Sequence, residues 1–225
     1  MGSFITLTAA DGHKIAVYEA KPAGKPRGGL VVVPEIFGVN AHMRDVADGY
    51  AADGFHVLAP CIFDRVERDY DRGYGPADRE AGIAIMRKLK PHEMLADIRA
   101  AVDMLKPEGK VGLVGYCLGG SLAWLASSAV DGLAATVGYY GGMIAANLEK
   151  QPKIPVLLHF GDDDGGIPVT DVEKVRAAAD PGLVQIFRYA GAGHAFNRAG
   201  TESWREDSAR LARERSLAFL GQHIG

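Results

Sequence analysis

One cysteine stands where the sequence predicts a sharp turn from a strand into a helix. Cys117 is the centre of Gly115-Tyr116-Cys117-Leu118-Gly119, a G-x-nucleophile-x-G pattern that presents a side chain for attack. The flanking glycines have a steric reason to be there, because so abrupt a turn leaves no room for a Cβ. The alternative is a buried core cysteine in an ordinary turn, since free cysteines are often buried. We interpret Cys117 as the candidate nucleophile.

A thiol nucleophile needs a base, and the order of residues along the chain narrows the choice. With a nucleophile on this kind of turn, the acid and then the base follow it, each on a loop after a strand. Of the seven histidines, only His194 follows Cys117 in such a loop. The acid must lie between them at a strand end, which indicates the cluster 162–164 and, by spacing, Asp164. A turn or a calcium loop is the alternative for this cluster, although the EF-hand ligand pattern is missing.

Together, these residue types can carry out acyl transfer. A thiol with an ordinary pKa of about 8.5 is mostly protonated at neutral pH, so His194 would take its proton and leave a thiolate. Asp164 would accept a hydrogen bond from the imidazole, fix its tautomer and stabilise the imidazolium. The backbone N–H of Leu118 would hold the oxyanion, together with a second N–H for which Ile36 is the candidate.

The elements that must position these groups follow from the hydrophobic pattern. Apolar runs predict buried strands at 30–33, 55–59, 111–114, 155–160 and 184–189, and one more strand that ends with residues 137–140. Besides the helix after Cys117, helices are predicted at 40–54, 78–88, 92–105, 169–179 and 202–223. This alternation indicates an α/β protein with a mostly parallel, doubly wound sheet and helices on both faces.

Two further stretches carry weaker signals. Residues 13–19 alternate apolar and polar types, which is typical of a half-exposed, antiparallel edge strand. Residues 61–76 are rich in Asp, Arg and Tyr, so we expect them to lie outside the core.

Bulk properties favour a small-molecule substrate. With 225 residues, 48% of them hydrophobic, the chain is expected to form one domain spanning 1–225, as a monomer or weak homodimer. A net charge of -3 with interspersed signs argues against nucleic acid and anionic membrane surfaces as partners. Two cysteines, the lack of a signal-like segment and the lack of long apolar runs predict a cytoplasmic protein. No metal-ligand spacing or phosphate-binding loop is present, so no cofactor is expected.

The chain resembles the dienelactone hydrolases, or carboxymethylenebutenolidases, over nearly its whole length. The likeness rests on PEIFGVN at 34–40, KVGLVGYCLGG at 110–120, GYYG at 138–141, G-x-x-D-x-x-I-P at 161–168 and GHAFNR at 193–198. It implies an α/β-hydrolase fold and a catalytic triad of Cys117, Asp164 and His194, in agreement with the chain order.

The resemblance also implies a role for Glu35. The family has an acidic partner of the thiol in its E-I-F-G segment, and Glu35 occupies that position. A carboxylate beside the thiol would raise the thiol's pKa and keep it protonated until the substrate displaces the interaction. Without the resemblance, Glu35 is simply a loop acid that caps the next helix.

Two arginines are implied as partners of a substrate carboxylate. The family's positions fall on Arg79 and Arg198, and the planar guanidinium suits bidentate binding of a carboxylate. A solvated surface arginine is the alternative for each. Dienelactone-specific members carry aromatic residues after the first arginine, whereas Ile83 and Met86 occupy the matching turns here. This departure leaves the substrate more open than the reaction.

The sequence therefore predicts a hydrolase that opens a carboxylate-bearing lactone through an acyl-thioester on Cys117, in the catabolism of aromatic compounds. Tyr139 or Tyr140, at a strand end near the turn, is expected to line the pocket, with a plain core position as the alternative. Two other functions stay open: a broader carboxylesterase, thioesterase or peptidase-like hydrolase, and a non-catalytic relative that senses through its thiol.

Overall fold

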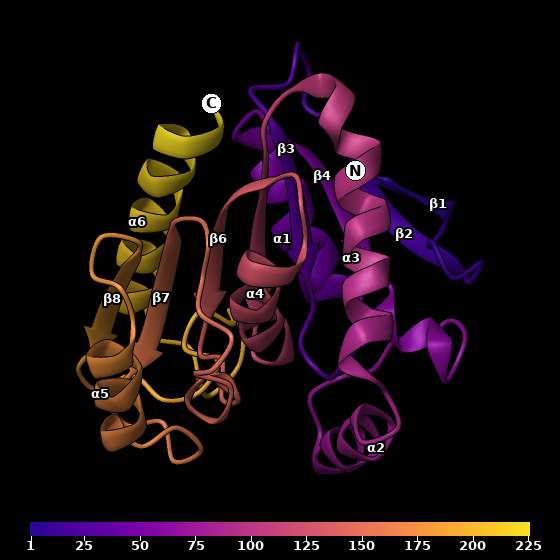
Figure 1. The fold of residues 1–225 in the computed structure, drawn as a ribbon. Helices are drawn as coiled ribbons and strands as arrows, with labels where there is room; N and C mark the ends of the chain where they lie inside the picture. The colour runs from indigo at the N-terminus through magenta and orange to yellow at the C-terminus, as the bar shows by residue number, and fades with distance from the viewer.

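The computed structural model describes residues 1–225 as an eight-stranded sheet with helices on both sides (Figure 1). The strand order is β1-β2-β4-β3-β5-β6-β7-β8. Pairing is antiparallel for β1 with β2 and for β2 with β4, and parallel for all the others. The strands are β1 (Ser3–Thr8), β2 (Lys14–Ala20), β3 (Gly29–Val33), β4 (His56–Pro60), β5 (Val111–Tyr116), β6 (Leu133–Tyr139), β7 (Val156–Gly161) and β8 (Val184–Tyr189). The predicted α/β class and mostly parallel sheet are confirmed.

Six α-helices connect or flank the strands. They are α1 (Ala41–Ala52), α2 (Pro76–Met86), α3 (Pro91–Leu105), α4 (Leu118–Ala129), α5 (Val169–Ala178) and α6 (Glu206–Ile224). Asn40 caps α1, because its side chain accepts a hydrogen bond from the Met43 N–H at 3.1 Å. Helix α6 begins four residues later than predicted, because the Trp204 N–H closes a turn onto the Thr201 carbonyl. None of the helices has the length and apolar character needed to cross a membrane.

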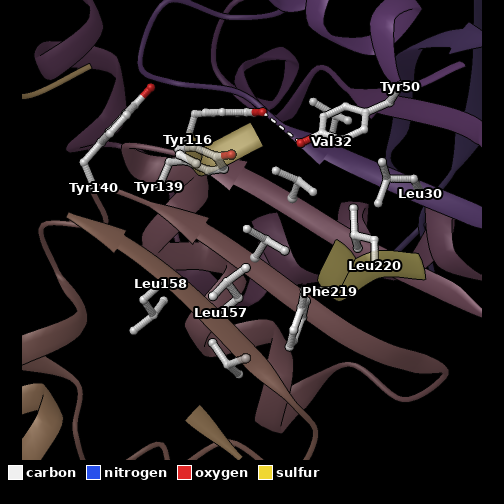
Figure 2. Close-up of a cluster of buried hydrophobic side chains, with 14 of the residues drawn as sticks. Leu30, Val32, Tyr50, Tyr116, Tyr139, Tyr140, Leu157, Leu158, Phe219 and Leu220 are labelled. Atoms are coloured by element: carbon white, nitrogen blue, oxygen red, sulfur yellow. Dashed lines mark hydrogen bonds between the residues drawn. The ribbon is translucent and has the colours of Figure 1, made fainter. Parts of the chain in front are cut away.

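The central strands are buried on both faces. Successive side chains of a strand point to opposite sides, so Leu30 and Val32 join one apolar cluster while Val31 and Val33 join the other. Helices α1 and α6 contribute to the first cluster, and α3 and α4 to the second. Figure 2 shows the first cluster, in which the hydroxyls of Tyr50 and Tyr116 lie 3.4 Å apart. This double cover holds the carboxyl ends of β5, β7 and β8 in fixed positions.

Two expectations about the first third of the chain are wrong. The strand at residues 13–19 is not at an edge, because β1 pairs with residues 14–19 of β2 and takes the edge position. Residues 61–76 also contribute to the core, since Ile62, Phe63 and Tyr70 are buried. Their polar neighbours obscured this in the sequence. A short 3-10 helix at Ile62–Arg65 turns the apolar side chains inward while Arg65 pairs with the buried Asp97 at 2.7 Å.

The buried His159 on β7 should make the protein sensitive to acid. Its ring nitrogens bond to the hydroxyls of Tyr189 (2.8 Å) and Ser216 (3.0 Å), and burial lowers the pKa of His159 to about 3. Between pH 6.5 and 3 the unfolded chain binds a proton at this residue that the folded chain does not, so stability falls as the pH falls. Between pH 7 and 5 this histidine should cost about 2 kcal/mol of unfolding free energy.

Urea unfolding of wild type and His159→Gln at the two pH values measures this effect. The variant is expected to be less stable at pH 7 but to lose less stability on acidification. The exposed His92 provides a matched control, because His92→Gln should keep the wild-type pH dependence. An equal pH dependence in wild type and His159→Gln would contradict the assignment.

Candidate active site

The turn around Cys117 has the strained geometry of a nucleophile elbow. Strand β5 ends at Tyr116 and α4 begins at Leu118, and Cys117 between them has φ of 55°, in the left-handed region that side chains with a Cβ rarely adopt. A Cβ on Gly115 would collide with the Gly119 carbonyl, and one on Gly119 would collide with the Val33 carbonyl. Both glycines are therefore required by close backbone approach, as the sequence pattern predicts.

The acid and the base come from the two neighbouring strands of the same sheet edge. Asp164 follows β7 and His194 follows β8, and the distance from His194 Nδ1 to Asp164 Oδ2 is 2.7 Å. The other oxygen, Asp164 Oδ1, accepts the Gly166 N–H at 2.8 Å. The acid is buried, whereas the imidazole keeps 39% of its side-chain surface. The carboxylate thus orients a histidine that a substrate can still reach.

The electrostatics favour a charged imidazole. Burial disfavours the imidazolium, but hydrogen bonds to Asp164 and Cys117, together with their negative charges, raise the pKa of His194 to about 10. For Asp164, burial acts to raise the pKa, and the hydrogen bond from His194 outweighs it, so the pKa of Asp164 is lowered. A folded-state pKa above the ordinary 6.5 means that the His194 contribution to stability is complete below pH 6.5 and is lost as pH rises through about 10.

The two residues predicted to donate to an oxyanion, Leu118 and Ile36, lie in the backbone around the elbow. Leu118 is the first residue of α4, so its N–H is one of those that a helix leaves without an acceptor in its own backbone. The loop after β3 is fixed against the elbow by the hydrogen bond from the Gly119 N–H to the Pro34 carbonyl at 3.2 Å. Ile36 in that loop lines the same pocket as Cys117. Leu118 is thus the residue directly after the candidate nucleophile, and Ile36 shares a pocket with it.

The pocket over the elbow has a volume of about 640 Å³. It brings together Cys117, Asp164 and His194 with both predicted arginines, Arg79 and Arg198. It also includes residues that sequence reasoning missed, namely Phe37, Tyr74, Arg87 and Ser203. Of these, Arg87 had a detectable signal, because it lies near Arg79 and Ile83 on one side of the predicted helix.

Glu35 and Arg198 form an ion pair with each other. Arg198 Nη2 donates to Glu35 Oε1 at 2.7 Å, and both residues are buried. No hydrogen bond joins Glu35 to the Cys117 thiol, which differs from the contact that the resemblance implies. The second oxygen, Glu35 Oε2, is buried and has no hydrogen-bond partner. The predicted partner of the thiol and the predicted partner of the substrate carboxylate are therefore engaged with one another.

Aromatic rings enclose the Arg198 guanidinium. It lies 3.9 Å from the centre of the Tyr74 ring and 5.3 Å from that of Phe37. Burial disfavours the charge of Arg198, but Glu35 outweighs it and raises the arginine's pKa. A solvated surface arginine, the alternative for this position, is excluded by these contacts. For Arg79 the picture differs, because it is exposed at the mouth of the pocket.

The two tyrosines after β6 have different surroundings. Tyr139 is a core residue (Figure 2) that does not line the pocket of Cys117, and its hydroxyl bonds to Ser216 Oγ at 2.7 Å. It therefore takes the plain core position that the sequence left open. The Tyr140 ring lies 4.8 Å from the His194 ring. Its hydroxyl is within hydrogen-bonding distance of Asn197 and of Glu35, the latter at 3.3 Å. Tyr140 therefore supports the histidine and the ion pair from behind the pocket.

The other cysteine has no comparable setting. Cys61 lines a separate cavity, where burial and nearby carboxylates such as Asp64 raise the pKa of its thiol to about 12. No cluster of three or more His, Cys, Asp or Glu side chains has an arrangement that would hold a metal ion.

Comparisons with known proteins agree with this arrangement. A sequence profile of the dienelactone hydrolase family matches residues 15–224. The chain is 34% identical over 235 residues to the carboxymethylenebutenolidase of Pseudomonas putida, and equally to that of Pseudomonas knackmussii, covering 96% of this chain and 94% of each relative. A candidate dienelactone hydrolase from Klebsiella pneumoniae has a solved structure that matches with a TM-score of 0.86 and 26% identity, over 99% of both chains.

The likeness extends along the whole sheet and is not confined to the elbow. The profile begins in β2 and ends at the last residue of α6, so it includes every strand that carries a site residue. This chain belongs to the dienelactone hydrolase family and has its α/β-hydrolase fold.

Proposed function

We propose that this ester hydrolase opens a carboxylate-bearing lactone by attack of Cys117, through an acyl-thioester intermediate. The observation that carries the proposal is that one pocket contains the thiol, the paired His194 and Asp164, and arginines at its wall and mouth. Thiol, imidazole and carboxylate in this order perform nucleophilic acyl transfer. The arginines select an anionic substrate.

The steps of the proposed hydrolysis follow from a Cys117 thiolate beside a His194 imidazolium. The Cys117 thiolate attacks the lactone carbonyl carbon, and the oxyanion that forms accepts hydrogen bonds from the N–H groups of Leu118 and Ile36. The bond from the carbonyl carbon to the ring oxygen then breaks, and the His194 imidazolium gives its proton to that oxygen. A water molecule, deprotonated by His194, attacks the thioester. The thiolate leaves, and the product carries a new carboxylate.

Charge complementarity at the pocket mouth sets the expected preference. Arg79 is exposed there and forms no ion pair, so its guanidinium is available to a substrate carboxylate. Arg198 reaches the same pocket but holds Glu35, so it binds substrate only by sharing or exchanging that partner. The catabolism of aromatic rings, which yields unsaturated lactones with a carboxylate, is the setting that we propose.

A pair of matched substrates tests the proposal. A five-membered enol lactone that bears a carboxymethylene group should be hydrolysed with kcat/KM at least about tenfold above that of its neutral methyl ester, because one charged contact of about 1.4 kcal/mol gives that factor. Acid quenching during turnover should trap an adduct on the peptide that contains Cys117. Its mass increase should equal the whole lactone, because the leaving oxygen stays attached to the acyl group.

A broader carboxylesterase is the second candidate. Ile83 and Met86 form an apolar wall of the pocket, which would accommodate a neutral acyl chain. The same substrate pair decides between the two functions. Equal rates on the anionic and neutral lactones, with the adduct still present, would favour the broader enzyme.

A further inference from the structure

Two cations of α2 lack any partner within the protein. Arg79 lies in the first turn of the helix and Arg87 is its C-terminal cap residue, and both are exposed. Neither has a carboxylate within ion-pair distance, although most other surface arginines of this chain do. The two residues are eight positions apart, which separates them by about 12 Å along the helix axis. They therefore form a cationic edge and not a single clamp.

This edge lies between two cavities. Arg79, Ile83 and Arg87 line the pocket above Cys117, and the same three residues line a groove of about 510 Å³ along the outer side of α2. The groove contains one acid, Glu80, which pairs with neither arginine. A molecule that enters from this side passes both guanidinium groups before it reaches the thiol.

The charge balance of the pocket leaves the guanidinium groups of both Arg79 and Arg87 without a negative partner. Arg198 is neutralised by Glu35, and the positive charge of the His194 imidazolium is balanced by Asp164. The two free positive charges are thus those of Arg79 and Arg87. A substrate with one carboxylate neutralises only one of them.

We propose that Arg87 is a specificity-determining residue that binds a second anionic group of the substrate, in an outer subsite that continues the pocket along α2. The substrate class is then an ester or lactone with two anionic groups remote from the scissile carbonyl. The inference rests on the proposed hydrolysis by Cys117. The outer subsite at Arg87 is exposed to solvent. The contribution of Arg87 to substrate binding is therefore electrostatic and is screened by salt.

Three 4-nitrophenyl esters that differ in charge test the subsite. The butyrate ester is neutral, the succinate half-ester is a monoanion, and the tricarballylate monoester is a dianion. In Arg87→Ala, the ratio of kcat/KM for the dianion to kcat/KM for the neutral ester should fall roughly fivefold. The fall should come from a higher KM for the dianion, and it corresponds to about 1 kcal/mol for an exposed charged contact. The difference should disappear at 0.5 M NaCl.

Matched variants separate this effect from a general change of charge. Lys88→Ala removes an equal charge from the next residue, which is exposed, unpaired and outside both cavities, and should leave the ratio at its wild-type value. Arg79→Ala should lower kcat/KM for the monoanion and the dianion alike. Arg87→Lys should recover part of the ratio.

The outcomes distinguish this inference from the proposed function. If Arg87→Ala and Lys88→Ala change the ratio equally, or not at all, while Cys117 is still required for hydrolysis, the outer subsite is refuted and the hydrolase stands. If hydrolysis does not depend on Cys117, the proposed function itself is refuted.

Discussion

Cys117→Ala should lower the hydrolysis rate roughly 10³- to 10⁶-fold, because the variant has no group that can form the acyl intermediate. The position of the residue gives the reason for so large an effect. The backbone places this one side chain at the head of α4, beside an imidazole whose pKa is raised to about 10. His194 and Asp164 are hydrogen-bonded to each other, so neither can replace Cys117 as the nucleophile without breaking that hydrogen bond.

The second cysteine supplies the control. Cys61→Ala should keep wild-type rates, since Cys61 lines a different cavity and its thiol pKa is raised to about 12. Steady-state hydrolysis and iodoacetamide labelling, followed by peptide mapping, measure both variants. Residual hydrolysis in Cys117→Ala at a tenth of the wild-type rate would exclude covalent catalysis by this thiol.

Arg198→Met should destabilise the protein by about 3–5 kcal/mol, because it leaves the buried Glu35 carboxylate without its charge partner. Glu35→Gln should also lower the free energy of unfolding, because it leaves the buried Arg198 guanidinium without its charge partner. The double variant should lose less unfolding free energy than the sum of the two single variants, since neither charge then remains buried alone. Urea unfolding of the four proteins at pH 7 gives this comparison.

An exposed pair provides the reference for that cycle. Arg210 and Glu214 lie 2.8 Å apart on α6 and both side chains are more than half exposed, so Arg210→Met should hardly change the unfolding free energy. Strict additivity for Glu35 and Arg198 would show that the pair contributes no interaction energy. The thiol offers a second readout. If Glu35 restrains Cys117 once it is released from Arg198, alkylation by iodoacetamide should be slower in Arg198→Met than in the double variant.

Much of the fold was accessible from local patterns. Apolar runs identified the buried strands because a strand covered on both faces can carry few polar side chains. The edge position of residues 13–19 was predicted wrongly because alternation reports one exposed face and says nothing of the neighbouring strand. The core residues of 61–76 were missed for a different reason, since the many charged residues that follow Phe63 and surround Tyr70 dominate the composition of this stretch.

Some features of the candidate site could likewise be predicted from the sequence, and others could not. The elbow glycines and the order of Cys117, Asp164 and His194 follow from the sequence, because each of the three residues lies within five positions of the end of a strand and the strands are parallel. The partner of Glu35 does not, because that carboxylate and Arg198 are 163 residues apart and meet only when β3 and the loop after His194 are in place. The same holds for Tyr139, whose hydroxyl meets Ser216 of α6 in the core and not the pocket.

The sequence by itself thus determined which side chains stand at the carboxyl edge of the sheet, and with them the chemistry expected of Cys117. The tertiary structure alone decided how the other charges around that thiol pair: Glu35 with Arg198, and Arg79 and Arg87 with no partner. The physical reason is the range of each effect. Steric demands at a turn act between chain neighbours, whereas ion pairing depends on distances that only the packed sheet and helices define.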